Sequence, residues 1–485
     1  MTLKLTDQSL LRADAFIAGA WIAAAPEAAI AVTNPADGAV IASVPSLSAE
    51  QIERAIAAAR SVRADWAGRP AKERSALLRK WYDLIVANAD DLAQILTCEQ
   101  GKPLAEAKGE ILSNAAYLEW FGEEAKRVYG EVIPAPAQDR RIIVLKQPIG
   151  VCAAITPWNF PNGMITRKAG PALAAGCPII VKPASQTPLS AIALAVLAER
   201  AGIPAGVFQV VTGKAQMIGS IFCKSPDVAK ISFTGSTEVG RWLIRESADD
   251  IKRLSLELGG NAPFIVFEDA DLDAAVAGAM IAKFRNSGQT CVCANRIYVH
   301  QSIAQDFAQR LAQAAQKLNV GDGAQDGVEQ GPLIDLAAVE KVEAHLQDAV
   351  MRGARVLSGG KRHALGGSWF EPTVLADVSP DALVAREETF APLAPVIPFA
   401  TEEEAIELAN RSEFGLAAYF YSRDLARVFR VAEALESGMV GINTGMIANE
   451  AAPFGGVKQS GLGREGSRHG IEEYVEMKYL CIAGL

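Results

Sequence analysis

A cysteine that follows a polar, glycine-containing turn is the residue in this chain with the clearest chemical potential. The run Asn286-Ser287-Gly288-Gln289-Thr290 leads directly into Cys291, so a turn would present the thiol at a surface. A thiol exposed in this way becomes a nucleophile when its pKa is lowered. A lone cysteine is more often a small buried apolar residue, so the turn alone leaves both interpretations open.

Two other polar groups could serve such a nucleophile. Glu257 lies near the end of the strand-like segment Ile251–Leu258, where apolar neighbours would raise its pKa toward that of a general base at neutral pH. Asn159 lies in a turn stiffened by two prolines, and a fixed side-chain amide can donate to an oxyanion. The alternatives are an edge-strand surface charge for the glutamate and ordinary turn chemistry for the asparagine.

Two strand ends are suited to a dinucleotide. The segment Thr234-Gly235-Ser236-Thr237-Glu238-Val239-Gly240 joins an expected strand to an expected helix, which aims backbone N–H groups at a phosphate. Only two glycines occur there, so a plain tight turn is an equal alternative. Lys182 ends another expected strand, where it could bind ribose hydroxyls or a phosphate, although a solvated surface lysine is the simpler interpretation. Ser185 is neutral, so it would tolerate the 2′-phosphate of NADP.

The elements that must position these groups alternate between short apolar strands and helices. Strands are expected at Arg141–Lys146, Val151–Ile155, Pro178–Val181, Val207–Val211, Ala229–Phe233, Ala262–Phe267, Arg355–Leu357 and Pro395–Pro398. Helices are expected at Ala49–Ala64, Ala71–Ala87, Pro188–Ala201, Glu238–Ser247, Ile303–Leu318 and Glu402–Asn410. This alternation predicts two doubly wound, mostly parallel sheets with a ligand cleft between them. Glu473–Leu480 looks like a terminal strand with no local partner, so we expect it to join a neighbouring subunit in an oligomer.

Composition and charge argue against several function classes. Lys and Arg number 47 and Asp and Glu number 56, for a net charge of −9, which disfavours nucleic-acid binding. The longest apolar run is too short and interrupted to cross a membrane, and residues 1–14 lack the plan of a signal peptide. Seven scattered cysteines indicate a reducing compartment, so we expect the cytoplasm. Four histidines outside any motif, with no G-x-S-x-G or H-E-x-x-H, argue against a hydrolase or a metal site.

Seven motifs in order resemble the aldehyde dehydrogenase superfamily across almost the whole chain. They are TPWNFP, VKPAS, FTGST, LELGGNAP, GQTCVC, EETFAP and PFGGVKQSGLGRE. The runs FRNSGQTC and GQTCVCANR and the ending GREGSRHGIEEYVEMKYLC resemble the succinate-semialdehyde dehydrogenases in particular. The resemblance implies an α/β fold with two doubly wound parallel-sheet domains and a small β oligomerisation element, in a homodimer or homotetramer. The implied dinucleotide-binding domain spans 1–125 and 147–258 with a return at 440–470, the catalytic domain 259–439, and the oligomerisation strands 126–146 and 471–485.

The resemblance also implies a role for each site residue. Cys291 would attack the aldehyde, Asn159 and the Cys291 backbone N–H would hold the oxyanion, and Glu257 would activate water to hydrolyse a thioester. Retention of Glu257 argues against the branch of the family that passes the thioester to coenzyme A. The implied cofactor is NADP, with NAD possible, and the implied contacts are Thr156, Trp158, Lys182, Ala184, Ser185, Gly235, Ser236, Gly240, Leu258, Glu388 and Phe390.

Two arginines match substrate-binding positions of the succinate-semialdehyde enzymes. Arg167 and Arg285 would bind a distal carboxylate by charge-assisted hydrogen bonds, although each could instead pair with an acidic neighbour. Ala448 stands where relatives carry a serine that donates to the same carboxylate, which leaves a slightly roomier pocket. Ala391 stands where relatives carry glycine. We therefore expect succinate semialdehyde first and glutarate semialdehyde or a broader aldehyde range second.

Three residues carry further hypotheses. Cys293 lies two positions after Cys291 on a strand-like segment and could form a strained, reducible disulfide with it, or be a second small core residue. Lys168 and Glu465 match positions linked to proton relay, with a structural ion pair as an equal alternative. A non-catalytic dinucleotide-binding protein that kept the fold is the alternative from another function class. The main prediction is a non-acylating NAD(P)-dependent aldehyde dehydrogenase that acts on a small semialdehyde, without nucleic-acid, membrane or metal partners.

Overall fold

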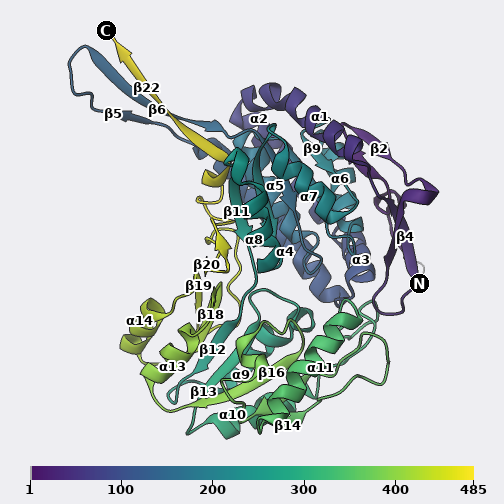
Figure 1. Ribbon diagram of the computed structural model, residues 1–485, viewed down its shortest axis with the longest axis vertical. Coiled ribbons are helices and arrows are strands. Elements are labelled where there is room, and N and C mark those ends of the chain that lie inside the picture. Colours follow the sequence, from purple (N-terminus) through teal and green to yellow (C-terminus); the bar gives the residue numbers. More distant parts are fainter. Residues whose placement is uncertain (1–2, 485) are drawn as a thin grey trace.

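Two β-sheets, each covered by helices, form the body of the molecule, and a three-stranded arm projects from it (Figure 1). The computed structural model describes residues 3–484, so residues 1–2 and 485 of the predicted segments lie outside the described residues. None of the helices within the described range has the length and apolarity that a membrane span requires. The expected architecture of two doubly wound, mostly parallel sheets with a small additional β element is confirmed.

The first sheet has a parallel centre with antiparallel strands at both edges. Its order is β2 (Ala20–Ile22), β1 (Ala15–Ile17), β9 (Phe208–Val210), β8 (Ile179–Lys182), β7 (Val151–Ile155), β10 (Val228–Thr234), β11 (Arg253–Glu257) and β21 (Gly461–Leu462). Its helices are α1 (Ala49–Gly68), α2 (Ala71–Ala87), α3 (Ala89–Gln100), α4 (Leu104–Glu124), α5 (Gly163–Ala175), α6 (Leu189–Ala201), α7 (Ala215–Lys224) and α8 (Thr237–Glu246). The strands and helices expected here from the sequence are confirmed, with small shifts at their ends.

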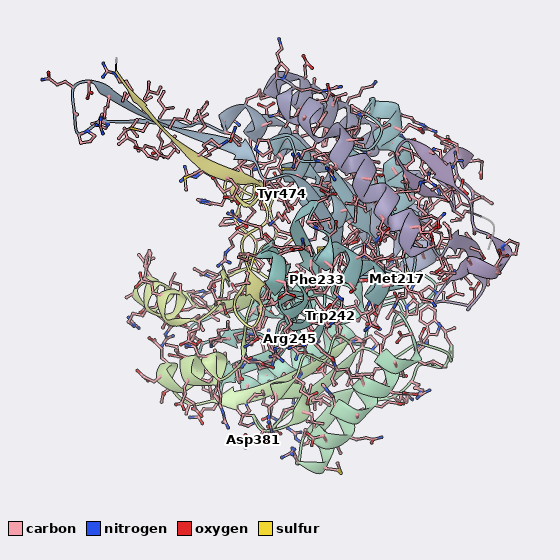
Figure 2. The ribbon with its side chains drawn as sticks, turned by 45° about the horizontal axis from the view of Figure 1, so that its top comes forward. Met217, Phe233, Trp242, Arg245, Asp381 and Tyr474 are labelled. Atoms are coloured by element: carbon pink, nitrogen blue, oxygen red, sulfur yellow. The ribbon has the colours of Figure 1, made fainter. Side chains whose placement is uncertain are left out.

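Both faces of this sheet are buried because successive apolar residues of one strand point to opposite layers. Cys152 and Ala154 of β7 pack into the core with α2 to α6, whereas Val151 and Ala153 pack into the core with α1, α7 and α8. The second layer includes Met217 of α7, Phe233 of β10 and Trp242 of α8, which Figure 2 labels. A strand buried on both faces reads as a continuous apolar run, which is why these strands could be recognised.

The second sheet is parallel except at β14. Its order is β14 (Arg355–Ser358), β15 (Thr373–Ala376), β16 (Leu393–Phe399), β13 (Ala294–His300), β12 (Ala262–Val266), β18 (Ala417–Tyr421) and β19 (Met439–Ile442). Its helices are α9 (Leu272–Phe284), α10 (Ala304–Ala315), α11 (Leu336–Met351), α12 (Leu383–Arg386), α13 (Glu402–Asn410) and α14 (Leu425–Ala434). β19 still pairs with β18, and the chain rejoins the first sheet at β21, within the range 440–470 where a return to the first domain is expected.

The arm corrects one expectation about the terminal strand. β22 (Val475–Ala483) finds its partner within the same chain, in the distant segment β6 (Arg140–Pro148), and the two pair from Val475 opposite Pro148 to Ala483 opposite Arg140. β5 (Glu131–Ile133) completes the order β22-β6-β5. Tyr474 lies at the base of the arm, where its carbonyl accepts from the backbone N–H of Ile149 at 3.1 Å (Figure 2).

The remaining elements are short. They are the ribbons β3 (Ala29–Thr33) with β4 (Val40–Pro45) and β17 (Phe414–Gly415) with β20 (Val457–Lys458), and the 3₁₀ turns η1 (Gln8–Leu10), η2 (Pro26–Ala28), η3 (Ala125–Arg127), η4 (Ala248–Asp250), η5 (Arg285–Gly288) and η6 (Glu472–Tyr474).

Candidate active site

A strained turn presents Cys291 between the two sheets. Asn286 and Ser287 within η5 have left-handed φ angles of 52° and 56°, which L-residues rarely adopt. Gly288 follows with φ 75°, and a Cβ there would lie 2.3 Å from the Ala391 carbonyl oxygen, so only glycine fits. β13 begins at Ala294, three residues after Cys291. The expectation of a strand-like segment over Cys291 and Cys293 is therefore wrong, because both residues lie in the turn before the strand.

A cavity of about 350 Å³ opens onto the Cys291 side chain. The residues that line it are Lys102, Glu106, Gly109, Glu110, Ser113, Asn114, Phe160, Met164, Arg167, Arg285, Thr290, Cys291, Val292, Met446, Ala448 and Phe454. The cavity thus brings together the predicted nucleophile, both predicted substrate arginines and Ala448.

Two hydrogen-bond donors beside the nucleophile are free for an oxyanion. The Asn159 Nδ2 atom donates to the Gln289 carbonyl at 3.1 Å, which uses only one of its two hydrogens within residues 3–484. The Cys291 backbone N–H has no hydrogen-bond acceptor anywhere in the described chain. Because Gln289 is two residues before Cys291, the contact fixes the Asn159 amide beside the nucleophile.

Glu257 ends β11, and the chain that follows it packs on the Cys291 turn from the side of the first sheet. Three residues later, a Cβ on Gly260 would lie 2.3 Å from the Cys291 carbonyl oxygen, so the segment after Glu257 packs directly on the nucleophile turn. The Glu257 carboxylate is buried, and its Oε2 atom has no partner among the described residues. Burial, followed by the charge of Glu465, raises its pKa well above the ordinary carboxylate value. The predicted direction of that shift is confirmed.

The pKa of the Cys291 thiol is raised, whereas a lowered pKa is what would make the thiol a ready nucleophile. The Cys291 side chain is partly exposed. Loss of hydration among the surrounding residues is the largest cause that raises its pKa, to about 12, and the negative charge of Glu388 is the second. Arg167 acts in the other direction. A raised pKa favours the thiol over the thiolate, so attack by Cys291 requires a group that accepts its proton.

The residues expected to hold a dinucleotide lie at the carboxyl ends of β7, β8 and β10. Lys182 ends β8 and is buried without an ion-pair partner in residues 3–484, and burial lowers its pKa to about 8. The Thr156 hydroxyl after β7 is buried and also lacks a partner within that range. Ala184 and Ser185 follow Lys182 in a partly exposed turn. Both unpartnered groups gain a hydrogen bond if a ligand's hydroxyl or phosphate binds here.

The turn after β10 is shaped by close packing. A Cβ on Gly235 would lie 2.4 Å from the Phe233 ring, and a Cβ on Gly240 would lie 2.6 Å from Leu258. Ser236 caps α8, since its hydroxyl accepts from the Val239 N–H at 3.4 Å. The two glycines therefore let the helix start close to the strand ends, with its free N–H groups facing the same edge of the sheet.

Glu388 and Phe390 approach the site from the second sheet. The Glu388 Oε1 atom accepts from the Gly260 N–H at 3.0 Å, and burial raises the pKa of this carboxyl to about 7. The Phe390 ring packs edge-on against Trp158 with centroids 5.6 Å apart. Phe390 has a left-handed φ of 58°, a strained conformation often found at functional sites.

Neither of the two arginines predicted to bind substrate forms a direct ion pair with a carboxylate of residues 3–484, although Glu465 and Glu257 act on Arg167 at longer range. Arg167 is buried, donates from Nε to Asn114 at 3.3 Å, and leaves its Nη1 atom without a partner in the described chain. Its guanidinium lies over the rings of Tyr117 and Phe454. The Arg285 guanidinium lies over the Phe160 ring at 5.6 Å.

Lys168 and Glu465 form a buried ion pair, and Lys168 also donates to the Thr234 hydroxyl at 2.7 Å. Thr234 is the register partner of Glu257 between β10 and β11, so the ion pair lies near Glu257. Glu465 accordingly raises the pKa of the Glu257 carboxyl, and Lys168 lowers it. Cys293 faces elsewhere: its buried thiol donates to the Lys283 carbonyl at 3.5 Å. That contact favours a core role for Cys293 over a disulfide with Cys291.

The cavity wall that α4 supplies was not predicted from the sequence. Lys102 precedes this helix, and Glu106, Glu110 and Asn114 recur on it every four residues, so all lie on one face. That spacing of polar residues was visible in the sequence. It would ordinarily indicate a solvated face, however, so it did not single them out.

Several known proteins resemble this chain in sequence and fold. A profile of the aldehyde dehydrogenase family matches residues 21–480. A glutarate-semialdehyde dehydrogenase of Pseudomonas aeruginosa is 62% identical over 483 residues, covering 100% of both chains. A succinate-semialdehyde dehydrogenase of Escherichia coli, whose name includes NADP(+), is 60% identical over 480 residues, covering 99% of this chain and 100% of the relative. A crystal structure of an aldehyde dehydrogenase from Brucella melitensis biovar abortus has a TM-score of 0.98 at 61% identity and covers 100% of both chains. The chain therefore belongs to the aldehyde dehydrogenase family, whose members oxidise aldehydes.

Proposed function

We propose that this dehydrogenase oxidises an aldehyde with a carboxylate at its far end, with succinate semialdehyde as the first substrate and glutarate semialdehyde as the second. The observation that carries the proposal is the pair of arginines without carboxylate partners among residues 3–484, in the same cavity as Cys291. A buried guanidinium with an unused N–H is costly, and a substrate carboxylate would satisfy it by charge-assisted hydrogen bonds.

The chemistry follows from the groups around Cys291. The sulfur bonds to the aldehyde carbon while Glu257 accepts the thiol proton, and Asn159 with the Cys291 N–H stabilises the oxyanion. A bound nicotinamide dinucleotide supplies the hydride acceptor, which leaves a thioester on Cys291. Glu257 releases the thiol proton to solvent and then takes one from water, whose oxygen bonds to the thioester carbon. The carbon–sulfur bond then breaks, the sulfur takes the proton from Glu257, and the carboxylic acid and the free thiol result.

NADP fits the residues that would hold it. Lys182 and Thr156 offer buried polar atoms without partners in the described chain. Ser185, which follows Lys182 closely, is neutral and so would not repel a 2′-phosphate. Glu388, Phe390 and Trp158 would hold the nicotinamide end, and the start of α8 would face the pyrophosphate. The Escherichia coli relative's name includes NADP(+), which supports the same cofactor, with NAD as an alternative.

The named relatives support a semialdehyde but divide on its length. Glutarate- and succinate-semialdehyde dehydrogenases resemble this chain at 62% and 60% identity, too close to separate C5 from C4 substrates. Both names describe enzymes, so the non-catalytic alternative gains no support. Ala448 lines the cavity at the position expected to touch the distal carboxylate.

Removing either arginine should cost activity only toward carboxylated aldehydes. Each lost charge-assisted hydrogen bond costs about 1.5–3 kcal/mol, so Arg167→Ala and Arg285→Ala should each lower kcat/KM for succinate semialdehyde by about 10- to 150-fold. Rates with uncharged aldehydes such as butanal should change little. A panel of aldehydes with and without a terminal carboxylate measures the difference. Arg310→Ala, which removes an exposed guanidinium paired with Asp306, is the matched control and should leave all substrates unaffected. Equal losses for charged and uncharged aldehydes would mean that the two arginines do not bind the distal carboxylate of the substrate.

Ala448→Ser should shift preference toward the shorter semialdehyde. The added hydroxyl can donate to a C4 carboxylate, and one such bond is worth about 1 kcal/mol, or about a fivefold rise in kcat/KM for succinate over glutarate semialdehyde. Competition between the two substrates measures this ratio directly. An unchanged ratio would show that residue 448 does not touch the distal carboxylate.

The assembly and compartment expected from the sequence also remain proposals. Val132, Met477 and Tyr479 on the arm are strongly exposed apolar residues, which supports burial against another subunit in a homodimer or homotetramer. All seven cysteines are free, which supports a reducing compartment such as the cytoplasm.

The division into dinucleotide-binding and catalytic domains is supported by the two sheets. Proton relay through Lys168 and Glu465 is supported by their position beside Glu257.

A further inference from the structure

A buried polar network behind the oxyanion donors ties the main chain of Asn159 to the nucleophile turn. The Asn159 carbonyl oxygen accepts two hydrogen bonds, one from Lys102 Nζ at 2.7 Å and one from Asn286 Nδ2 at 3.0 Å. The same Asn286 amide donates to the Gln289 carbonyl at 3.1 Å. That carbonyl is also the acceptor of the Asn159 side chain. One amide group therefore sets the spacing between the two segments that supply the oxyanion donors.

Asn286 is itself fixed from two sides. Gln100 Nε2 donates to its Oδ1 atom at 3.0 Å, and its backbone N–H donates to Glu106 Oε2 at 2.8 Å. These contacts hold a fully buried residue in a left-handed conformation, which asparagine tolerates better than most residues. The strain of the turn is thus stabilised by groups from α3 and α4 rather than by the turn alone.

Lys102 is anchored in the same way. Its ammonium donates to Glu110 Oε2 at 2.6 Å, and it lies 3.9 Å from the centre of the Phe160 ring. The other Glu110 oxygen accepts from the backbone N–H groups of Asn162 and Gly163, both at 3.1 Å. Lys102, just before α4, and Glu110, on α4, therefore hold the segment from Asn159 to Gly163.

We propose that Asn286 and Lys102 are positioning residues for the oxyanion, because they fix the Asn159 carbonyl and so aim the free Asn159 Nδ2–H at the reacting carbonyl. This inference rests on the oxyanion role proposed for Asn159. Neither residue donates to the oxyanion. A donor displaced by a fraction of an ångström loses most of its effect on a charge that develops only in the transition state, so the loss should fall on kcat.

The test uses near-isosteric variants and steady-state kinetics on the full-length enzyme with NADP and succinate semialdehyde. Asn286→Asp keeps the side-chain shape but loses both amide hydrogens, and Lys102→Met keeps the length but loses the ammonium. Each should lower kcat by about 10- to 100-fold while KM changes by less than about threefold, as expected when only a transition-state interaction is lost. The matched control is Lys230→Met, which removes another buried lysine, one that bonds Ser255 instead. It should lower thermal stability with little change in kcat.

A double-mutant cycle separates positioning from a general structural role. Asn159→Ala alone should lower kcat by about 10²- to 10³-fold. Adding Asn286→Asp to it should cause less than about a threefold further loss, since both changes remove the same interaction. The proposal would be overturned if the kcat losses of Asn159→Ala and Asn286→Asp multiplied in the double mutant. It would also be overturned if both near-isosteric variants kept full kcat, or if their losses were confined to KM. If Asn159→Ala keeps full activity, the oxyanion assignment itself fails, whatever the Asn286 variants show. Binding of NADP, followed by fluorescence, confirms that each variant is folded, and Lys102→Met keeps the test open if Asn286→Asp does not fold.

Discussion

Cys291→Ser should lower aldehyde oxidation by about four orders of magnitude or more, the largest effect of any single change in this enzyme. The reason is that the step needs a sulfur nucleophile that forms a thioester, and a serine hydroxyl at this position is far harder to deprotonate. Cys291 is the cysteine that lines the substrate cavity, whereas the Cys293 thiol is bonded to a main-chain carbonyl behind it. The measurement is the appearance of reduced cofactor by absorbance in the first turnover and at steady state.

Two controls make this loss interpretable. NADP binding should persist in Cys291→Ser, because Lys182, Thr156 and the start of α8 are untouched. Cys293→Ser is the matched change two residues away, and it should keep most of its activity and remain sensitive to alkylation at Cys291. Substantial steady-state oxidation by Cys291→Ser would mean that another group is the nucleophile.

Glu257→Gln should separate the two halves of the reaction. Without a carboxylate to accept the proton of water, turnover should fall by about 10²- to 10⁴-fold. In the first turnover, water or another base takes the thiol proton, so the thioester still forms and then accumulates. The mass of the intact protein should therefore increase by one succinyl group. The expected signature is therefore a slow single burst of reduced cofactor, close to one per active site, and almost no steady state.

The pH dependence follows from the direction of the Glu257 shift. Glu257 accepts a proton only when it is ionised, and burial raises its pKa well above the ordinary carboxylate value. The wild-type kcat should therefore fall as pH decreases through that raised pKa, at a pH where an exposed carboxylate would still be fully ionised. Glu257→Gln should lose this acid limb. A limb at the ordinary carboxylate pKa, or one that survives in the variant, would contradict the assignment.

Much of the scaffold could be predicted because strands buried on both faces leave a local signal. Val151–Ile155 and Glu402–Asn410 were predicted with their observed bounds, since apolar runs and capped helices depend on neighbouring residues. The terminal strand could not be paired in this way. Its partner β6 is distant in the chain, and pairing depends on where the fold brings the two strands together.

The site was predicted where its residues form sequence motifs and was missed where they do not. Cys291, Glu257 and Asn159 each follow a strand or turn, whereas the groups that hold Asn286 come from positions 186 and 180 residues away. Glu106 and Lys102 would read as surface charges of a helix start. The pKa of Cys291 was also missed, because desolvation by the cavity walls is a property of packing and not of the local sequence.

In the proposed mechanism, the sulfur of Cys291, the carboxylate of Glu257 and the amide of Asn159 act on one carbonyl group. A crystal structure of Glu257→Gln reacted with NADP and succinate semialdehyde would show whether they do. We expect a thioester on Cys291 whose carbonyl oxygen lies about 3 Å from Asn159 Nδ2 and from the Cys291 backbone nitrogen. We also expect the distal carboxylate to lie between Arg167 and Arg285, with the residue 257 side chain facing the thioester carbon. An adduct on another residue, or a carbonyl oxygen turned away from Asn159, would mean that the three groups do not act on one carbonyl.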